Sequence, residues 1–241
     1  MTAILSIQET TEIFYPSGDG EPMAETYDHV YAIMATLEVL KQYLTGRQAT
    51  VLGNQFLYYS QGFPKLRVAP DVMVIFDVAP GGRDNYKIWA EGQVPAVIFE
   101  MTSPGTEDND KSFKKTLYAQ LGVKEYWLFD PKGEWIPEKL RGYRLMWEEI
   151  YEPITDGRSE PLQLRLAVED KLISFYREDT GEKLLLPDEL ATALDEKTAQ
   201  LSQEMQARQE AEAQAEAERQ RREEMEAMLA RYREQFGELP E

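Results

Sequence analysis

Three short apolar runs constrain the fold of this chain more than any other feature. They are Val72–Phe76, Val97–Met101 and Glu125–Phe129. The first run is apolar without interruption, which is typical of a strand buried on both faces of a sheet. Between the second and third runs, Ser112–Leu121 has the pattern of a helix that ends at Gly122. This strand–helix–strand order predicts a mixed central β-sheet flanked by helices, an α/β (α+β) fold.

Other elements are predicted on either side of this core. Met23–Leu44 has apolar residues at helical spacing and is expected to form an amphipathic helix. Shorter strands are expected at Tyr143–Trp147, Leu162–Val168 and Leu172–Tyr176, separated by glycine and proline. Either Asn109 or Asp110 is expected to cap the helix that precedes Gly122.

The composition changes near Pro187. Residues 188–236 contain no glycine or proline and are rich in Ala, Glu, Gln and Arg, which predicts a long C-terminal helix. An apolar stripe near its end has four members at heptad-like spacing: Met225, Leu229, Tyr232 and Phe236. The helix is expected to be either a solvated helix or a dimerising coiled coil. We therefore expect a folded domain at residues 1–187 and a charged helical tail at residues 188–241.

The composition excludes several kinds of chemistry. The chain has no cysteine and one histidine, His29, so disulfides, thiolate sites and multi-histidine zinc sites are ruled out. A Ser-His-Asp triad would need His29, and the chain has no Gly-x-Ser-x-Gly motif. No apolar run approaches the roughly 20 residues of a membrane span. We expect a soluble, cytoplasmic protein without a membrane partner.

The charge balance bears on nucleic-acid binding. The formal net charge is −18. Residues 188–241 hold 15 acidic and 7 basic residues, a net charge of −8, which leaves −10 on the rest of the chain. Nucleic-acid binders usually carry a basic surface, so this balance argues against tight nonspecific binding of DNA.

Two carboxylates stand beside the predicted buried strands. Asp71 precedes the first strand and Glu100 lies near the end of the second. A charge next to the core is costly unless it is paired or binds a metal. Two carboxylates from adjacent strands could share one Mg²⁺ ion, which prefers oxygen ligands. The alternatives are a turn-forming Pro-Asp pair at Asp71 and a Glu100 carboxylate bound by backbone amides or an arginine.

Helical geometry selects one lysine to accompany these acids. The predicted buried stripe of the middle helix has three members: Phe113, Leu117 and Leu121. Because successive helical residues step by about 100°, Lys114 lies nearest the stripe and can lean towards Glu100. Lys111 and Lys115 are expected to face solvent. Lys114 could orient an attacking water, or its stem could simply cover apolar surface.

The chain resembles the Uma-type (Uma-two) branch of the PD-(D/E)XK restriction-endonuclease-like superfamily. The matching blocks are Pro70-Asp71-Val72, Glu100 to Pro104, Asp110 with Lys114 and Tyr118, and Gly122 to Pro131. The resemblance extends from the first helix, where His29 matches a recurrent histidine of the family, to about Leu190.

This resemblance implies a restriction-endonuclease-like core for residues 1–187 and a Mg²⁺ ion, or alternatively Mn²⁺, held by Asp71 and Glu100. The backbone oxygen of Met101 is a further candidate ligand. The superfamily places a lysine two residues after the glutamate, where this chain has Thr102. In this branch the lysine lies on the following helix, at Lys114.

Further candidates surround this set. Glu25 and His29 are four residues apart on the first predicted helix and so share a face, from which they could contact the metal site. Arg83, Lys87 and Trp89 could form a substrate-facing loop, because arginine and aromatic side chains suit phosphates and bases. A histidine satisfied at a helix edge and a loop packed on the core are the alternatives.

These observations predict a Mg²⁺-dependent endonuclease that cleaves DNA, with Asp71 and Glu100 as metal ligands and Lys114 positioning the water. The alternative is a nuclease-like fold kept for nucleic-acid binding or scaffolding through its helical tail. An RNA substrate would differ only in specificity. The core and the helical tail are both candidate surfaces for a homodimer.

Overall fold

The computed structural model describes residues 13–20, 25–102, 113–147 and 150–237. The chain divides into two compact units, residues 1–186 and residues 187–241. Within these described ranges, the first unit contains the sheets and three helices, and the second contains one long helix. The predicted helix cap at Asn109 or Asp110 lies outside the described residues.

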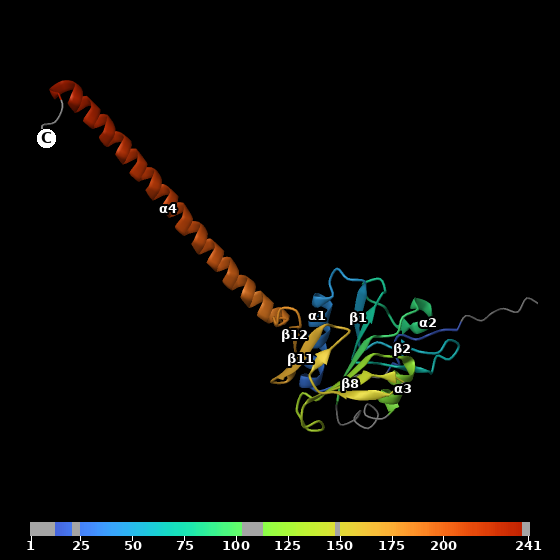
Figure 1. The fold of residues 1–241 in the computed structure, drawn as a ribbon. Helices are drawn as coiled ribbons and strands as arrows, with labels where there is room; N and C mark the ends of the chain where they lie inside the picture. Colours follow the sequence, from blue (N-terminus) through green and yellow to red (C-terminus); the bar gives the residue numbers. More distant parts are fainter. Residues whose placement is uncertain (1–12, 21–24, 103–112, 148–149, 238–241) are drawn as a thin grey trace, which may run out of the picture. The chain divides into compact units, whose positions relative to one another are not determined.

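A six-stranded sheet in the order β1-β4-β6-β7-β8-β9 forms the centre of the first unit (Figure 1). Its strands are β1 (Ala49–Gly53), β4 (Val72–Phe76), β6 (Val97–Met101), β7 (Glu125–Phe129), β8 (Leu140–Leu145) and β9 (Tyr151–Ile154). β6 and β7 pair in parallel, and every other neighbouring pair is antiparallel. The prediction of an α/β fold with a mixed central sheet is confirmed.

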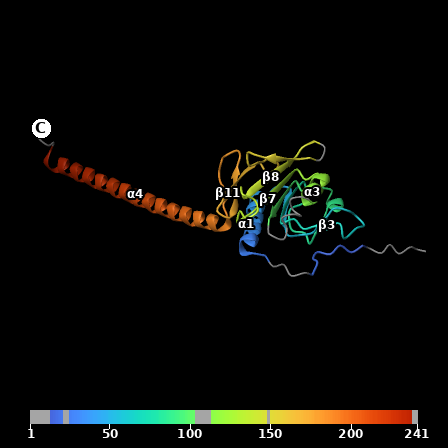
Figure 2. The same cartoon turned by 90° about the horizontal axis from the view of Figure 1, so that it is seen from below.

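Different elements cover the two faces of this sheet (Figure 2). Helix α1 (Tyr27–Tyr43) and a three-stranded sheet pack on one face. Helix α3 (Lys115–Leu121) and a second small sheet pack on the other. The first small sheet contains β10 (Arg158–Ser159), β11 (Leu164–Glu169) and β12 (Leu172–Arg177). The second contains β3 (Arg67–Val68), β2 (Leu57–Tyr58) and β5 (Tyr86–Lys87), which leads into the short helix α2 (Ile88–Glu91).

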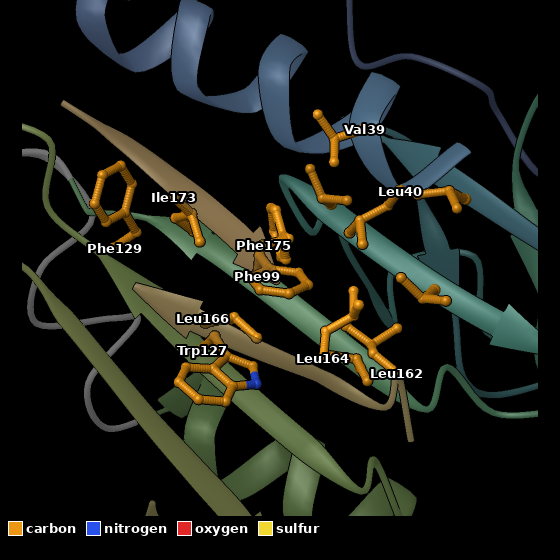
Figure 3. Packing of buried hydrophobic residues seen from close by; sticks show 14 of the residues in the cluster. Val39, Leu40, Phe99, Trp127, Phe129, Leu162, Leu164, Leu166, Ile173 and Phe175 are labelled. Atoms are coloured by element: carbon orange, nitrogen blue, oxygen red, sulfur yellow. The ribbon is translucent and has the colours of Figure 1, made fainter. Parts of the chain in front are cut away.

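The alternation of side chains along the strands divides the core in two. In β4, Val72 and Val74 join the cluster beneath α1, whereas Met73 and Ile75 join the cluster beneath α3. Figure 3 shows the first cluster, in which Val39 and Leu40 of α1 lie above aromatic and aliphatic side chains of the strands. Burial on both faces explains why β4 is apolar at every position, and why β6 and β7 are apolar apart from Glu100 and Glu125.

Helix α3 differs from the expectation in two respects. A wider π-helical turn at Phe113 and Lys114 precedes its first α-helical residue, Lys115. Phe113 was predicted to be buried but is 54% exposed, and Leu117, Tyr118 and Ala119 form the buried face instead. Gly122 ends the helix in the left-handed conformation, as its place in the sequence predicted.

The second unit is helix α4, which runs from Pro187 to Phe236. Its 50 residues confirm the predicted long C-terminal helix. Among the described residues, no helix is long and apolar enough to cross a membrane.

Candidate active site

The ends of two antiparallel strands bring the two predicted carboxylates to one rim of the central sheet. The ladder between β4 and β6 pairs Val72 with Phe99. Asp71 directly precedes Val72 and Glu100 directly follows Phe99. Because the strands run in opposite directions, both acids lie at the same end of the ladder. A rim where strands end is a common place for ligands in α/β sheets.

Glu100 is a buried carboxylate with two donors from the helix that follows its strand. Only 1% of the residue is exposed. Lys114 Nζ lies 2.9 Å from Glu100 Oε2, and the hydroxyl of Tyr118 donates to Oε1 at 2.8 Å. Both oxygens therefore have a protein donor, and the ammonium group offsets the cost of burying the charge.

Lys114 and the neighbouring lysine point to different partners. The side chain of Lys114 is 12% exposed and reaches Glu100 from the wide turn that begins the helix. Lys115 was predicted to face solvent, but its Nζ lies 3.5 Å from the centre of the Tyr143 ring on β8. The sequence did not indicate this cation–π contact, because it joins elements that are distant along the chain.

Tyr118 is a site residue to which sequence reasoning assigned no role. Its side chain is fully buried and donates to Glu100. The signal was present, because Tyr118 follows Lys114 by four residues and residues at this spacing share a helix face. One helix face therefore supplies both donors to Glu100.

Asp71 is held by the backbone of the neighbouring strand. Its Oδ2 accepts a hydrogen bond of 2.6 Å from the backbone N–H of Met101. The backbone oxygen of Asp71 instead accepts from Asn54 N, which lies after β1. The Asp71 side chain thus takes the place of a ladder acceptor where β4 turns away from β6. This bond fixes the carboxylate beside Met101, whose backbone oxygen is the third predicted metal ligand.

His29 lies next to Asp71 from the side of α1, and Glu25 lies next to His29. His29 Nε2 is 4.0 Å from Asp71 Oδ2 and 3.9 Å from Glu25 Oε2. The N-cap of α1 is Thr26, whose hydroxyl accepts from the backbone N–H of His29. The helix start therefore places the imidazole, which is 6% exposed, against the rim.

A small cavity lies beside His29. Its volume is about 60 Å³, and His29, Thr102 and Asp130 are among the residues that line it. Within the described part of the chain, His29 Nδ1 and Thr102 Oγ1 are buried without a hydrogen-bond partner. Thr102 stands where the superfamily pattern has lysine, and the structure places it at this cavity. The space and the two polar atoms suit a bound water molecule.

The carboxylate of Asp130 is bound by backbone N–H groups of the turn that follows it. Its two carboxylate oxygens accept four backbone N–H groups in the turn that follows β7, from Lys132, Gly133, Trp135 and Ile136. The carboxylate therefore organises the turn after the strand rather than reaching the other acids.

The predicted substrate residues lie elsewhere, around the small β3-β2-β5 sheet. Arg83 binds the carboxylate of Glu91 at 2.7 Å, and this hydrogen bond raises the pKa of Arg83. Lys87 Nζ lies 5.0 Å from the centre of the Tyr15 ring, and the Trp89 ring lies 5.3 Å from the same ring. None of the contacts described for these residues joins them to Asp71, Glu100 or Lys114.

The donor set at the rim suits a hard cation. Asp71, Glu100 and the backbone oxygen of Met101 are all oxygen donors, which Mg²⁺ and Mn²⁺ prefer. Within residues 13–20, 25–102, 113–147 and 150–237, no group of three or more His, Asp or Glu side chains is close enough to hold a metal. Mg²⁺ commonly keeps several waters, so two carboxylates and one backbone oxygen would be a sufficient set of protein ligands.

Comparison with known proteins adds a family to this geometry. The model of the Uma2 family, described as "Putative restriction endonuclease", matches residues 6–173. The chain belongs to the Uma2 family. The matched range contains every residue of the rim, from Glu25 to Tyr118. Membership in a nuclease family favours a metal-dependent enzyme but does not identify the metal.

Part of this Uma2 family member is also similar to a protein of known structure. A crystal structure titled as a "putative nuclease belonging to DUF820" from Anabaena variabilis ATCC 29413 is similar to it, with a TM-score of 0.40 and 18% sequence identity. The similarity covers 57% of this chain and 72% of that chain. No curated protein matches the sequence.

Proposed function

We propose that this Uma2 family member is a Mg²⁺-dependent endonuclease that hydrolyses DNA phosphodiester bonds. One observation carries the proposal: the buried carboxylate of Glu100 binds Lys114 at the rim of the sheet, where Asp71 precedes the adjacent strand β4. A pair of acids with a lysine is the chemistry that such a reaction needs, and family membership points to the same class.

Asp71, Glu100 and the backbone oxygen of Met101 are the proposed metal ligands. Each carboxylate oxygen has more than one lone pair, so a cation can share Glu100 with its present donors. The bond from Met101 N to Asp71 Oδ2 restricts rotation of that carboxylate. When bound, the cation supplies Lewis acidity to the phosphate and lowers the pKa of a bound water.

Lys114 and Tyr118 have separate roles in this proposal. Lys114 offsets the charge of Glu100 before the cation arrives, then turns its ammonium group towards the attacking water and the developing negative charge. Tyr118 keeps its hydrogen bond to Glu100 Oε1 and so fixes the orientation of the carboxylate. His29 flanks Asp71 and limits its movement, and Glu25 lies on the imidazole of His29.

The first experiment compares two buried glutamates on adjacent strands. Glu100→Gln removes a proposed metal ligand. Glu125→Gln removes an acid at the other end of the β6–β7 ladder, where Glu125 is fully buried and binds Arg144 at 3.0 Å. Both variants replace a buried, paired carboxylate by an amide of the same shape, so both report the structural cost of the change.

Cleavage of supercoiled plasmid DNA would be measured with Mg²⁺, Mn²⁺ and EDTA, with folding followed by circular dichroism. We expect Glu100→Gln to abolish cleavage while Glu125→Gln, once corrected for its folded fraction, cuts like wild type. Equal cleavage by wild type and folded Glu100→Gln would falsify the proposed site.

A second candidate function is a nuclease-like fold that binds or scaffolds partners without cleavage. The observation that favours it is the net charge of −18, because affinity for phosphates rests largely on lysine and arginine. Calorimetric titration of Mg²⁺ into the full chain separates the two functions: binding that disappears in Asp71→Asn supports the nuclease, and no binding to wild type supports the scaffold. A parallel assay with single-stranded RNA tests the alternative substrate.

A further inference from the structure

Helix α4 exposes large apolar side chains towards both of its ends. Eight large apolar residues on it are between 41% and 67% exposed: Leu190, Leu194, Leu201, Met205, Met225, Met228, Leu229 and Tyr232. All except Met205 and Met228 fall on the a and d positions of one heptad frame, in which Leu194, Leu201 and Leu229 occupy a. One seam of the helix therefore carries apolar residues near both ends.

The middle of the same seam is charged or small. Between Leu201 and Met225, the a and d positions hold in turn Glu204, Arg208, Ala211, Ala215, Glu218 and Arg222. The order acid, base, alanine, alanine, acid, base is symmetric about the two alanines when charge is reversed. Such a pattern distinguishes between the two ways in which a pair of identical helices can associate.

A parallel pair in register is disfavoured by this pattern. Each a or d residue of a parallel coiled coil faces the same residue of the partner helix. Glu204 would then face Glu204, and Arg222 would face Arg222. Like charges placed together in an interface cost several kcal/mol. Four central layers of the seam would be repulsive.

An antiparallel pair matches the pattern. With Ala211 facing Ala215 at the centre, Leu201 faces Met225 and Leu194 faces Tyr232. In the same register Glu204 faces Arg222, and Arg208 faces Glu218. Every charged layer between the two apolar ends then joins opposite charges, and the small alanines allow the helices to approach closely at the middle.

Shifting the register by one heptad destroys this match. In one direction Leu201 would face Glu218, and Lys197 would face Arg222. In the other direction Glu204 would face Leu229, and Arg208 would face Met225. Of these three registers, only the centred one combines apolar–apolar layers with acid–base layers. In that register Lys197 faces Leu229, a mismatch that the long lysine stem can accommodate by extending its ammonium group to water.

We propose that α4 is an association surface for a second copy of this chain, paired antiparallel and centred on Ala211 and Ala215. The arginines of the seam already bind acids of their own helix, Arg208 with Glu212 at 2.9 Å and Arg222 with Glu226 at 3.9 Å. Their guanidinium groups have donors for a second carboxylate. These charge pairs set orientation and register, while the apolar ends supply the affinity. This association involves α4 alone and is independent of the proposed enzymatic activity.

A charge exchange tests the pairing in the full-length chain by sedimentation equilibrium. Arg222→Glu places an acid opposite Glu204 in two layers and is expected to raise the dissociation constant of the dimer by about 100-fold or more. The double variant Glu204→Arg/Arg222→Glu restores opposite charges only if the helices are antiparallel. Arg231→Glu changes the net charge equally at an outer heptad position and serves as the matched control.

We expect wild type, Arg231→Glu and the double variant to be dimers, and Arg222→Glu to be mostly monomeric. Because Glu and Arg have similar helix propensities, circular dichroism should show the same helicity in all four. A monomeric wild type overturns the proposal, and so does a wild-type dimer that Arg222→Glu leaves unaffected. A double variant that fails to recover the dimer also overturns it.

Disulfide trapping tests the register independently, because the chain has no native cysteine. Leu201→Cys and Met225→Cys chains are prepared separately, oxidised alone and oxidised as a mixture. The antiparallel register cross-links only the mixture, because two copies of residue 201 would lie roughly 36 Å apart along the axis at 1.5 Å per residue. Efficient cross-linking of Leu201→Cys with itself would instead show parallel helices and refute the model.

Discussion

The ammonium nitrogen of Lys114 lies 2.9 Å from Oε2 of Glu100, and this contact joins the start of helix α3 to the end of strand β6. The contact stabilises the fold, because the Glu100 carboxylate is only 1% exposed and a buried charge is costly unless it is paired. The lysine that stabilises the metal-free protein is also the one proposed to act on the substrate. Replacement of Lys114 is therefore expected to lower both the stability and the proposed activity. Added Mg²⁺ is expected to restore the stability alone.

Lys114→Met is expected to lower DNA cleavage by about 100- to 1000-fold, since it removes a positive charge from the developing phosphate charge. It is also expected to lower the melting temperature without Mg²⁺, because Glu100 loses its ammonium partner. Added Mg²⁺ should recover much of the melting temperature but not the cleavage rate. Lys115→Met, which affects the contact with Tyr143, is the control. If Lys114→Met cleaves DNA at the rate of wild type, Lys114 has no part in the reaction.

Tyr118→Phe is expected to weaken Mg²⁺ binding by about 10- to 100-fold, because partners that orient a metal ligand typically contribute this much. Calorimetric titration of Mg²⁺ measures the effect. Tyr151→Phe makes the same chemical change at a buried tyrosine that donates to the backbone oxygen of Val123. If both variants bind Mg²⁺ as wild type does, the hydrogen bond to Glu100 has a structural role only.

Asp130→Asn is expected to lower the free energy of unfolding by about 2–4 kcal/mol. Four backbone N–H groups point at the carboxylate, and the amide NH₂ group of asparagine cannot accept from any of them. Urea unfolding followed by tryptophan fluorescence gives the value. Asp156→Asn changes an exposed carboxylate that accepts a single bond from Arg158 N and should cost far less. A similar cost for both variants would contradict the structural role of Asp130.

Ionisation of Tyr86 is expected to lower the free energy of unfolding at alkaline pH. Burial raises the pKa of Tyr86 to about 12 from an ordinary value of 10.0. The pKa of Tyr86 is higher in the folded chain than in the unfolded chain. The protonated phenol therefore contributes fully to the free energy of unfolding below pH 10, and this contribution decreases as the pH rises towards 12. The unfolding free energy of wild type should therefore fall more steeply across this range than that of Tyr86→Phe. Parallel curves for the two proteins would show that the phenol is not the source.

The sequence predicted the elements whose patterns are long or strongly apolar. The three central strands, the helix between them and the long C-terminal helix were all expected. Short strands such as β9 and β10 were not predicted, because they have few residues and Pro153 interrupts the pattern of β9. A proline is tolerated there because β9 is an edge strand.

The contacts of single side chains were harder to predict than the elements. The helical phase pointed Lys114 towards Glu100, where the structure places it. The same phase wrongly buried Phe113, because a π-helical turn at the start of the helix changes the angle between successive residues. The ion pair between Arg83 and Glu91 was not predicted either, because the chain folds back to bring the two side chains together. The role of Arg83 in substrate binding stays a prediction. Residue spacing alone does not predict a π-helical turn or a loop that folds back on itself.

The hydrogen bond from Met101 N to Asp71 Oδ2 spans 30 residues of the chain and forms only when β4 and β6 are paired in their final register. A slip of one residue would turn every side chain of the strand to the opposite face. Long-range strand pairing of this kind forms slowly, because the intervening loop must first be closed. The proposed metal ligands would therefore come together late in folding. A newly synthesised or partly unfolded chain would thus lack the proposed metal site until β4 and β6 have paired.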